Sequence, residues 1–152
     1  MDKEKNIKFF DPQITVKNKS ISNRLQFLPN STIPLPSEVE ISESGLCNRK
    51  CSFCPRSDPN YKHAQEFFSN TLHDKLCKDL AEYNFNGIFA YCGFNEPLLK
   101  KDIYRDIEFA RKTLPESKIE IVTNGDVLDR DRLKELYNAG LTTILISVYD
   151  GK

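Results

Sequence analysis

Three cysteines crowd into one short loop of the sequence. Cys47, Cys51 and Cys54 lie four and then three positions apart, in a segment that opens with Gly45. A loop of this kind can wrap around one corner of a cubane iron–sulfur cluster. A [4Fe-4S] cluster usually takes four cysteines, so three would leave one iron free to bind another molecule.

Two other interpretations of these cysteines stay open. A zinc site could be completed by His63, Cys77 or Cys92, or the three thiols could carry no metal. Zinc is disfavoured because no second cysteine pair at zinc-ribbon spacing follows. Cys77 and Cys92 are most simply small core residues. His63 and His73 are expected to be solvated, because the sequence shows no partner for either.

The composition limits the class of protein. The 152 residues suit one ordinary domain, and 22 Lys and Arg balance 22 Asp and Glu, so neither nucleic acid nor a membrane surface is expected as a partner. No stretch approaches the about 18 apolar residues of a membrane span, and the N-terminus has no apolar signal core. Five unevenly spaced cysteines do not indicate a disulfide framework. We therefore expect a cytoplasmic protein with reduced thiols.

Two regions differ in their pattern. Residues 1–37 are polar, carry several prolines and show no lasting periodicity, which predicts an extended N-terminal arm. From Val39 onward, short β-branched or aromatic runs alternate with amphipathic segments. Strands are expected at residues 39–42, 87–92, 118–123 and 142–149.

Three helices are expected between these strands. Their apolar stripes are Leu72, Leu76, Leu80 and Tyr83, then Ile103, Ile107, Ala110 and Leu114, then Leu133, Leu136 and Tyr137. The first begins at a cap on Ser69 or Asn70, the second near Asp102 and the third at Asp129. Pro115 ends the second helix and Gly140 follows the third.

This order of elements predicts an α/β fold with parallel strands, because crossover helices join parallel neighbours. The rhythm alone does not choose between a barrel and a doubly wound sheet. A group of polar or reactive residues follows each of the first three strands, namely the cysteines, residues 93–97 and residues 124–125, and Ser147 lies near the end of the fourth. All would lie at one edge, where parallel α/β folds place their active sites.

The segment CNRKCSFC resembles the three-cysteine signature of the radical S-adenosylmethionine (radical SAM) superfamily, including Phe53 before the last cysteine. The resemblance implies that Cys47, Cys51 and Cys54 hold a [4Fe-4S] cluster. Its open iron would bind the amino and carboxylate groups of S-adenosylmethionine, with Phe53 beside the adenine. The implied fold for residues 38–152 is a partial TIM-like (β/α) barrel, truncated after the fourth strand.

Three weaker motifs extend the resemblance. YCGFNEPLL resembles the family's Gly-Gly-Glu-Pro motif, which places Gly93 and Glu96 at the methionyl ammonium. Asn95 stands where many relatives have glycine, and asparagine tolerates a positive φ. Thr-Asn-Gly ending at residue 125 resembles the end of the family's third strand and makes Asn124 a cofactor contact, and Ser147 would face the ribose. Taken singly, these residues are better explained by ordinary turns and backbone hydrogen bonds, and only their order and spacing together favour the family's roles.

The resemblance implies an enzyme that cleaves S-adenosylmethionine reductively and uses a 5′-deoxyadenosyl radical to abstract hydrogen from a substrate. That substrate would be an unknown peptide or small metabolite, and the electron would come from a donor such as flavodoxin or ferredoxin. The family's barrel has roughly six strand–helix steps and the match covers four, so we expect a fragment, a truncated product or half of an assembly.

Two alternatives to an active enzyme stay open. One is a cluster-binding remnant or partner subunit without turnover, and the other is a zinc-stabilised interaction module. Arg49, Lys50 and Arg56 flank the cysteines, where they would either offset the thiolate charge or remain solvated.

Overall fold

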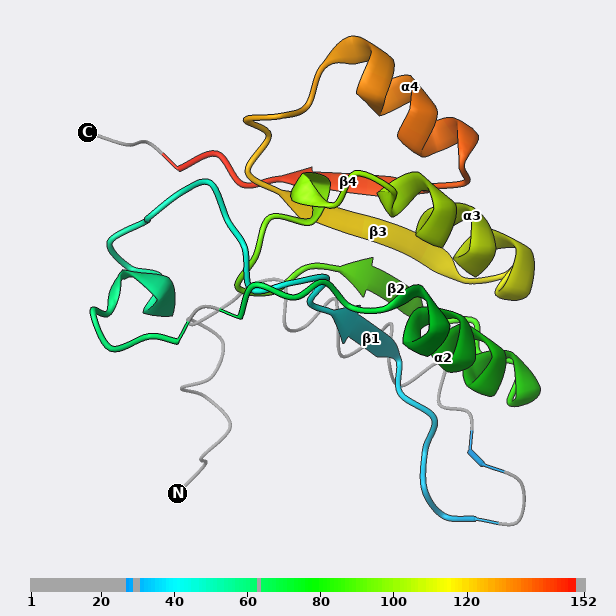
Figure 1. Cartoon of the computed structure of the whole chain (residues 1–152). Coiled ribbons are helices and arrows are strands. Elements are labelled where there is room, and N and C mark those ends of the chain that lie inside the picture. The colour runs from blue at the N-terminus through cyan, green and yellow to red at the C-terminus, as the bar shows by residue number, and fades with distance from the viewer. Residues whose placement is uncertain (1–26, 29–30, 63, 150–152) are drawn as a thin grey trace, which may run out of the picture. The chain divides into compact units, whose positions relative to one another are not determined.

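The computed structural model describes residues 27–28, 31–62 and 64–149 (Figure 1). The chain divides into two units, residues 1–37 and 38–152. In the first unit, Phe27 and Pro34 form an isolated antiparallel bridge. Most of the arm predicted for residues 1–37 lies outside the described residues, so the arm stays a prediction.

The second unit contains a parallel sheet whose strands follow one another in chain order. The strands are β1 (Glu38–Ile41), β2 (Ile88–Tyr91), β3 (Lys118–Thr123) and β4 (Thr143–Ile146). This confirms the predicted α/β fold. The order also decides between the two architectures, because a doubly wound sheet reverses its strand order whereas a barrel does not.

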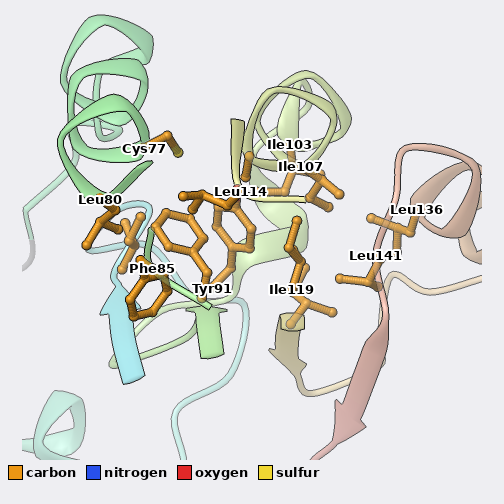
Figure 2. Close-up of a cluster of buried hydrophobic side chains, with 14 of the residues drawn as sticks. Cys77, Leu80, Phe85, Tyr91, Ile103, Ile107, Leu114, Ile119, Leu136 and Leu141 are labelled. Carbon is orange, nitrogen blue, oxygen red and sulfur yellow. The ribbon is translucent and has the colours of Figure 1, made fainter. Parts of the chain in front are cut away.

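The helices lie together against one side of this sheet (Figures 1 and 2). They are α2 (Asn70–Glu82), α3 (Ile103–Thr113) and α4 (Arg130–Asn138), with short 3-10 turns η2 (Pro55–Ser57) and η3 (Pro97–Leu99). As predicted, Ser69 caps α2 and Asp129 caps α4, each accepting a backbone N–H with its side chain. None of the helices in the described part of the chain combines the length and apolar character that a membrane crossing requires.

The core fills the space between the helices and the sheet (Figure 2). Alternate side chains of the central strands point into it, and Phe89 and Tyr91 of β2 lie in register with Ile119 and Ile121 of β3. Each of these side chains is fully buried. Burying one apolar side chain of this size stabilises the fold by about 1.5–3 kcal/mol. The strand ends, and hence the loops beyond them, are fixed by this packing.

The buried face of α2 differs from the predicted stripe. Leu72 is 55% exposed, whereas His73 and Cys77 are fully buried. His73 Nε2 lies 2.9 Å from the Tyr91 hydroxyl, and burial lowers the pKa of the imidazole below its ordinary value. The expectation of a solvated His73 was therefore wrong, because its partner lies on a strand distant in sequence. His63 lies outside the described residues.

Strand β4 is shorter than predicted and ends at Ile146. Its neighbour β3 ends at Thr123, whose carbonyl accepts the last bond of the ladder from Ser147 N at 2.8 Å. Beyond Thr123 the neighbouring chain turns at Gly125, which has φ +79°, so β3 offers residues 147–149 no further partner.

One buried lysine joins the segments that follow β1 and β2. Lys100 Nζ donates to Glu43 Oε2 at 2.8 Å, to the Asp106 carboxylate and to the Phe68 carbonyl at 3.2 Å. The lysine and both carboxylates are at most 4% exposed. Burial raises the pKa of Glu43 even though the lysine hydrogen bond opposes the shift.

We expect Lys100→Met to lower the free energy of unfolding by about 3–5 kcal/mol, because it leaves the buried Glu43 without its cation and Asp106 with only the ion pair to Arg105 among the Lys and Arg contacts of the described residues. Denaturant unfolding of the metal-free protein measures the change. Lys112→Met is the matched control, because the Lys112 side chain is 72% exposed and pairs with Glu108, which lies one helical turn away and is itself exposed. Its loss should cost no more than about 0.5 kcal/mol. Equal costs for the two variants would contradict the structural role of Lys100.

Candidate functional site

Loops that follow all four strands line one pocket of about 270 Å³. The pocket contains every residue that the sequence singled out for cluster or cofactor binding: Cys47, Cys51, Phe53, Cys54, Gly93, Glu96, Asn124 and Ser147. The structure thus brings together residues that are up to a hundred positions apart, and their individual roles remain proposals.

The three cysteines are half-buried and form no disulfide. Cys54 N donates to the Cys51 carbonyl at 3.0 Å, which closes a turn, and Cys54 then leads into η2. The Cys47 sulfur faces two N–H donors, the Arg49 backbone nitrogen at 3.4 Å and Asn124 Nδ2 at 3.9 Å. Such contacts suit a sulfur that carries negative charge as a metal ligand.

Within residues 27–28, 31–62 and 64–149, no three Cys, His, Asp or Glu side chains converge as ligands of a single metal ion. The cysteines of a [4Fe-4S] cluster bind separate irons at the corners of a cube, so they need only surround the same space. Cys47, Cys51 and Cys54 meet that requirement because all three line the pocket. The donor set is therefore compatible with a cubane cluster.

Gly93 occupies a position that only glycine fits. Its φ of +115° lies in the left-handed region, and a Cβ atom built there would overlap the Ser42 hydroxyl. The backbone after β2 therefore approaches the end of β1 closely. Any side chain at this position would separate the two loops that line the pocket.

Asn95 contributes side-chain hydrogen bonds, whereas the sequence suggested that its role was to tolerate a positive φ. Asn84 is the non-glycine residue with a positive φ in the described residues, so Asn95 does not need that conformation. With the side-chain amide oriented so that both its nitrogen and its oxygen are hydrogen bonded, Asn95 donates to the Cys92 carbonyl and accepts from Glu43 N and Ser44 N, at 3.0–3.3 Å. The amide thus links the chain after β1 to the end of β2.

Glu96 is buried, with 1% of its surface exposed. One carboxylate oxygen accepts from Leu98 N at 3.1 Å and from the Thr123 hydroxyl at 2.6 Å, and the other accepts from Asn124 N at 2.8 Å. No cation pairs with it among the described side chains. A carboxylate can accept about four hydrogen bonds, so one acceptor position remains for a group in the pocket. Glu96 is not a solvated turn residue.

Asn124 and Ser147 reach the pocket from the ends of β3 and β4. Asn124 Nδ2 donates to Asn48 Oδ1 at 2.8 Å, and Asn124 Oδ1 accepts from Asp126 N at 2.9 Å. The Ser147 backbone nitrogen bonds to the Thr123 carbonyl, while its hydroxyl makes no hydrogen bond to the part of the chain that is described. The Ser147 hydroxyl is therefore available to a ligand.

Arg56 is a pocket residue that sequence reasoning treated only as a flanking charge. It is 8% exposed, and its Nη1 donates to the Gly45 carbonyl and to the Phe94 carbonyl, the latter at 3.2 Å. Its Nε is buried without a partner, and no carboxylate pairs with it in the described residues. A buried guanidinium with spare donors can bind a carboxylate. Nothing in the local sequence shows this burial.

Tyr149 is a second residue that the sequence did not indicate, because residues 142–149 read as one continuous strand. Its ring packs edge to face against Phe53, with 4.7 Å between ring centroids and 69° between ring planes. Both rings line the pocket, and Phe53 is 65% exposed and Tyr149 49%. The two rings thus form one aromatic surface of the pocket, in which the cysteine loop contacts the segment that follows β4.

The family model described as "Radical SAM superfamily" matches residues 42–152, most of the described sheet and all of the pocket. The chain belongs to the radical SAM superfamily. This confirms the resemblance seen in the cysteine motif. The superfamily's cofactors are a [4Fe-4S] cluster and S-adenosylmethionine.

Individual radical SAM relatives differ in their reactions. The S-adenosyl-L-methionine-dependent 2-deoxy-scyllo-inosamine dehydrogenase of Niallia circulans is 29% identical over 115 residues, 76% of this chain and 46% of the relative. The GTP 3′,8-cyclase of Aquifex aeolicus is 30% identical over 113 residues, 73% of this chain and 34% of the relative. The chain thus spans less than half the length of either relative.

A solved structure supports the same assignment. The crystal structure of BtrN in complex with AdoMet and 2-DOIA superposes with a TM-score of 0.73 at 27% identity, covering 78% of this chain and 48% of BtrN. The similarity extends to fold as well as sequence. It confirms the partial TIM-like barrel predicted for this part of the chain.

We expect Glu96→Gln to lower the free energy of unfolding of the metal-free protein by about 1–3 kcal/mol. The new amide nitrogen is a donor placed against a neighbouring N–H or hydroxyl donor, so at least one buried hydrogen bond is lost. Glu116→Gln, at an exposed position before β3, should leave stability unchanged. Denaturant unfolding compares the two variants, and an unchanged midpoint for Glu96→Gln would show that its three hydrogen bonds contribute nothing.

Proposed function

We propose that this chain forms the cluster-binding part of a radical SAM enzyme. Cys47, Cys51 and Cys54 hold a [4Fe-4S] cluster, and the adjoining pocket binds S-adenosylmethionine. The observation that carries the proposal is the gathering of all the candidate residues, from four separate loops, around one pocket. When bound, the cluster and S-adenosylmethionine supply reductive cleavage of a carbon–sulfur bond and the 5′-deoxyadenosyl radical that abstracts hydrogen.

Glu96 receives the methionyl ammonium in this proposal. Its carboxylate is buried, has one acceptor position left and faces no protein cation in the described residues. An ammonium group would supply the missing positive charge through a charge-assisted hydrogen bond. The absence of a side chain at Gly93 lets the backbone come close to the same group.

Arg56 receives the methionyl carboxylate. Its guanidinium is held by two backbone carbonyls and keeps a buried nitrogen without a partner. A carboxylate beside it would complete both the charge and the hydrogen bonding of this side chain. Glu96 and Arg56 together give the pocket one anionic and one cationic group, which matches the zwitterionic end of S-adenosylmethionine.

The nucleoside end of S-adenosylmethionine would lie along the other wall. Phe53 and Tyr149 offer aromatic surface to the adenine, and the unused Ser147 hydroxyl can bind a ribose hydroxyl. Asn124 acts through the cysteine loop, because its side-chain amide donates toward Cys47 and Asn48.

For the substrate and the electron donor, we propose only a chemical class and a type of protein. The two relatives act, by their names, on an aminocyclitol and on GTP, so membership of the family does not select a substrate. We propose a peptide or small metabolite, with flavodoxin or ferredoxin as the type of one-electron donor. A reducing compartment such as the cytoplasm suits the free thiols.

Electron paramagnetic resonance tests the cofactor assignment. The protein is reconstituted anaerobically with iron and sulfide, reduced, and measured with and without S-adenosylmethionine. We expect a [4Fe-4S]⁺ signal that changes when S-adenosylmethionine is added, because the molecule binds the iron without a cysteine. A spectrum indifferent to S-adenosylmethionine would contradict the proposal. A changed spectrum without 5′-deoxyadenosine as a product would indicate binding without turnover.

Substitution of one cysteine tests the ligand set. We expect Cys51→Ala to lose stoichiometric iron, because the cluster would keep only two thiolate ligands. Cys77→Ala is the matched control, since Cys77 lies buried in α2, where burial raises the pKa of its thiol to about 12. Metal analysis after reconstitution, with circular dichroism as a check on folding, compares the variants. Full iron in Cys51→Ala would overturn the assignment, and tightly held zinc in the wild type would favour an interaction module.

A further inference from the structure

The cysteine loop is attached to the turn after β3 through one carboxylate. Arg49 Nε donates to Asp126 Oδ2 at 2.7 Å, and Arg49 Nη2 donates to Asp126 Oδ1. Asn48 Nδ2 also donates to Asp126 Oδ2, at 3.0 Å. Both residues that directly follow Cys47 therefore bind the same side chain, 77 or 78 positions further along the chain.

The turn holds that carboxylate in a defined place. Asn124 Oδ1 accepts from Asp126 N at 2.9 Å, Gly125 adopts φ +79°, and Asn124 Nδ2 returns to Asn48 Oδ1 at 2.8 Å. Hydrogen bonding to Arg49 also holds the pKa of Asp126 below its ordinary value. Planar, bidentate pairing and a third donor distinguish this contact from a single mobile surface ion pair.

The same residues place the hydrogen-bond donors of one cysteine. The Cys47 sulfur is approached by Arg49 N and by Asn124 Nδ2, whereas the sulfurs of Cys51 and Cys54 receive no hydrogen bond in the described part of the chain. Both donors belong to residues that are themselves hydrogen bonded to Asp126: Arg49 through its guanidinium and Asn124 through its side-chain oxygen. Fixing Arg49 and Asn48 therefore also fixes where the Cys47 sulfur points.

We propose that Asp126 is a positioning residue for the cysteine loop, holding it in a ligand-ready shape before the cluster arrives. The inference rests on the proposed function, because it takes the three cysteines as cluster ligands. Asp126 is not among the residues that line the pocket and makes no hydrogen bond to a cysteine in the described part of the chain, so it acts through Arg49 and Asn48. A loop ordered in advance loses less conformational entropy when it binds its ligand.

Limited proteolysis of the metal-free protein tests the ordering alone. Trypsin can cut after Lys50, which is exposed within the loop. We expect Asp126→Asn to raise the rate of this cleavage about fivefold, as for an ion pair at the strong end of the exposed range. Asp131→Asn, at a 90%-exposed side chain of α4, should leave the rate unchanged. An unchanged rate in Asp126→Asn would overturn the proposal.

Cluster retention and charge reversal test the positioning role. After reconstitution, Asp126→Asn and Arg49→Asp should each lose iron to a chelator several times faster than the wild type, and Asp126→Arg combined with Arg49→Asp should recover most of the difference. Single variants that retain iron like the wild type, or a double variant as weak as the singles, would overturn the role. If the wild type takes up no iron, the proposed function fails, while cleavage after Lys50 still decides whether Asp126 orders the loop.

Discussion

The pocket depends on the parallel pairing of the four strands. Parallel strands end at the same edge of a sheet, so the chain after each strand arrives at one place, and Cys47 and Ser147 line the same pocket. The register is held from the other side by the core, where Phe89 lies opposite Ile119. A slip of one residue would turn these side chains away from the helices. Packing against the helices therefore sets the geometry of the loops.

Buried charged side chains that line the pocket differ in their partners from the buried lysine outside it. Lys100 is surrounded by two buried carboxylates, so its charge is neutralised within the protein. Glu96 and Arg56 are also buried, yet each hydrogen bonds to neutral groups and meets no opposite charge in the described residues, and Arg56 Nε has no partner. Burying an unpaired charge costs stability, which proteins tolerate where a ligand supplies the complement. For Glu96 and Arg56, which line one pocket, this contrast supports the proposed binding of a molecule that carries both signs of charge.

Local signals in the sequence were sufficient for the elements and for the cysteine motif. The alternating run of β3 gave both of its ends, and Ser69 and Asp129 identified the starts of α2 and α4. The burial of His73 and Arg56 could not be predicted in this way. Their partners lie on elements remote in sequence, and neither residue type signals burial by itself. The meeting of the loops followed from the parallel topology, but the individual contacts did not.

The cysteine loop has almost no regular structure, so its shape must come from polar contacts at its two flanks. On one flank, Arg56 is buried and binds the carbonyls of Gly45 and Phe94, a contact that salt screens little. On the other flank, the pair of Arg49 and Asp126 is about one third exposed and is open to screening and exchange with water. The loop is thus held near η2 by a buried contact and after Cys47 by a partly exposed one, so only the second should weaken as salt is added.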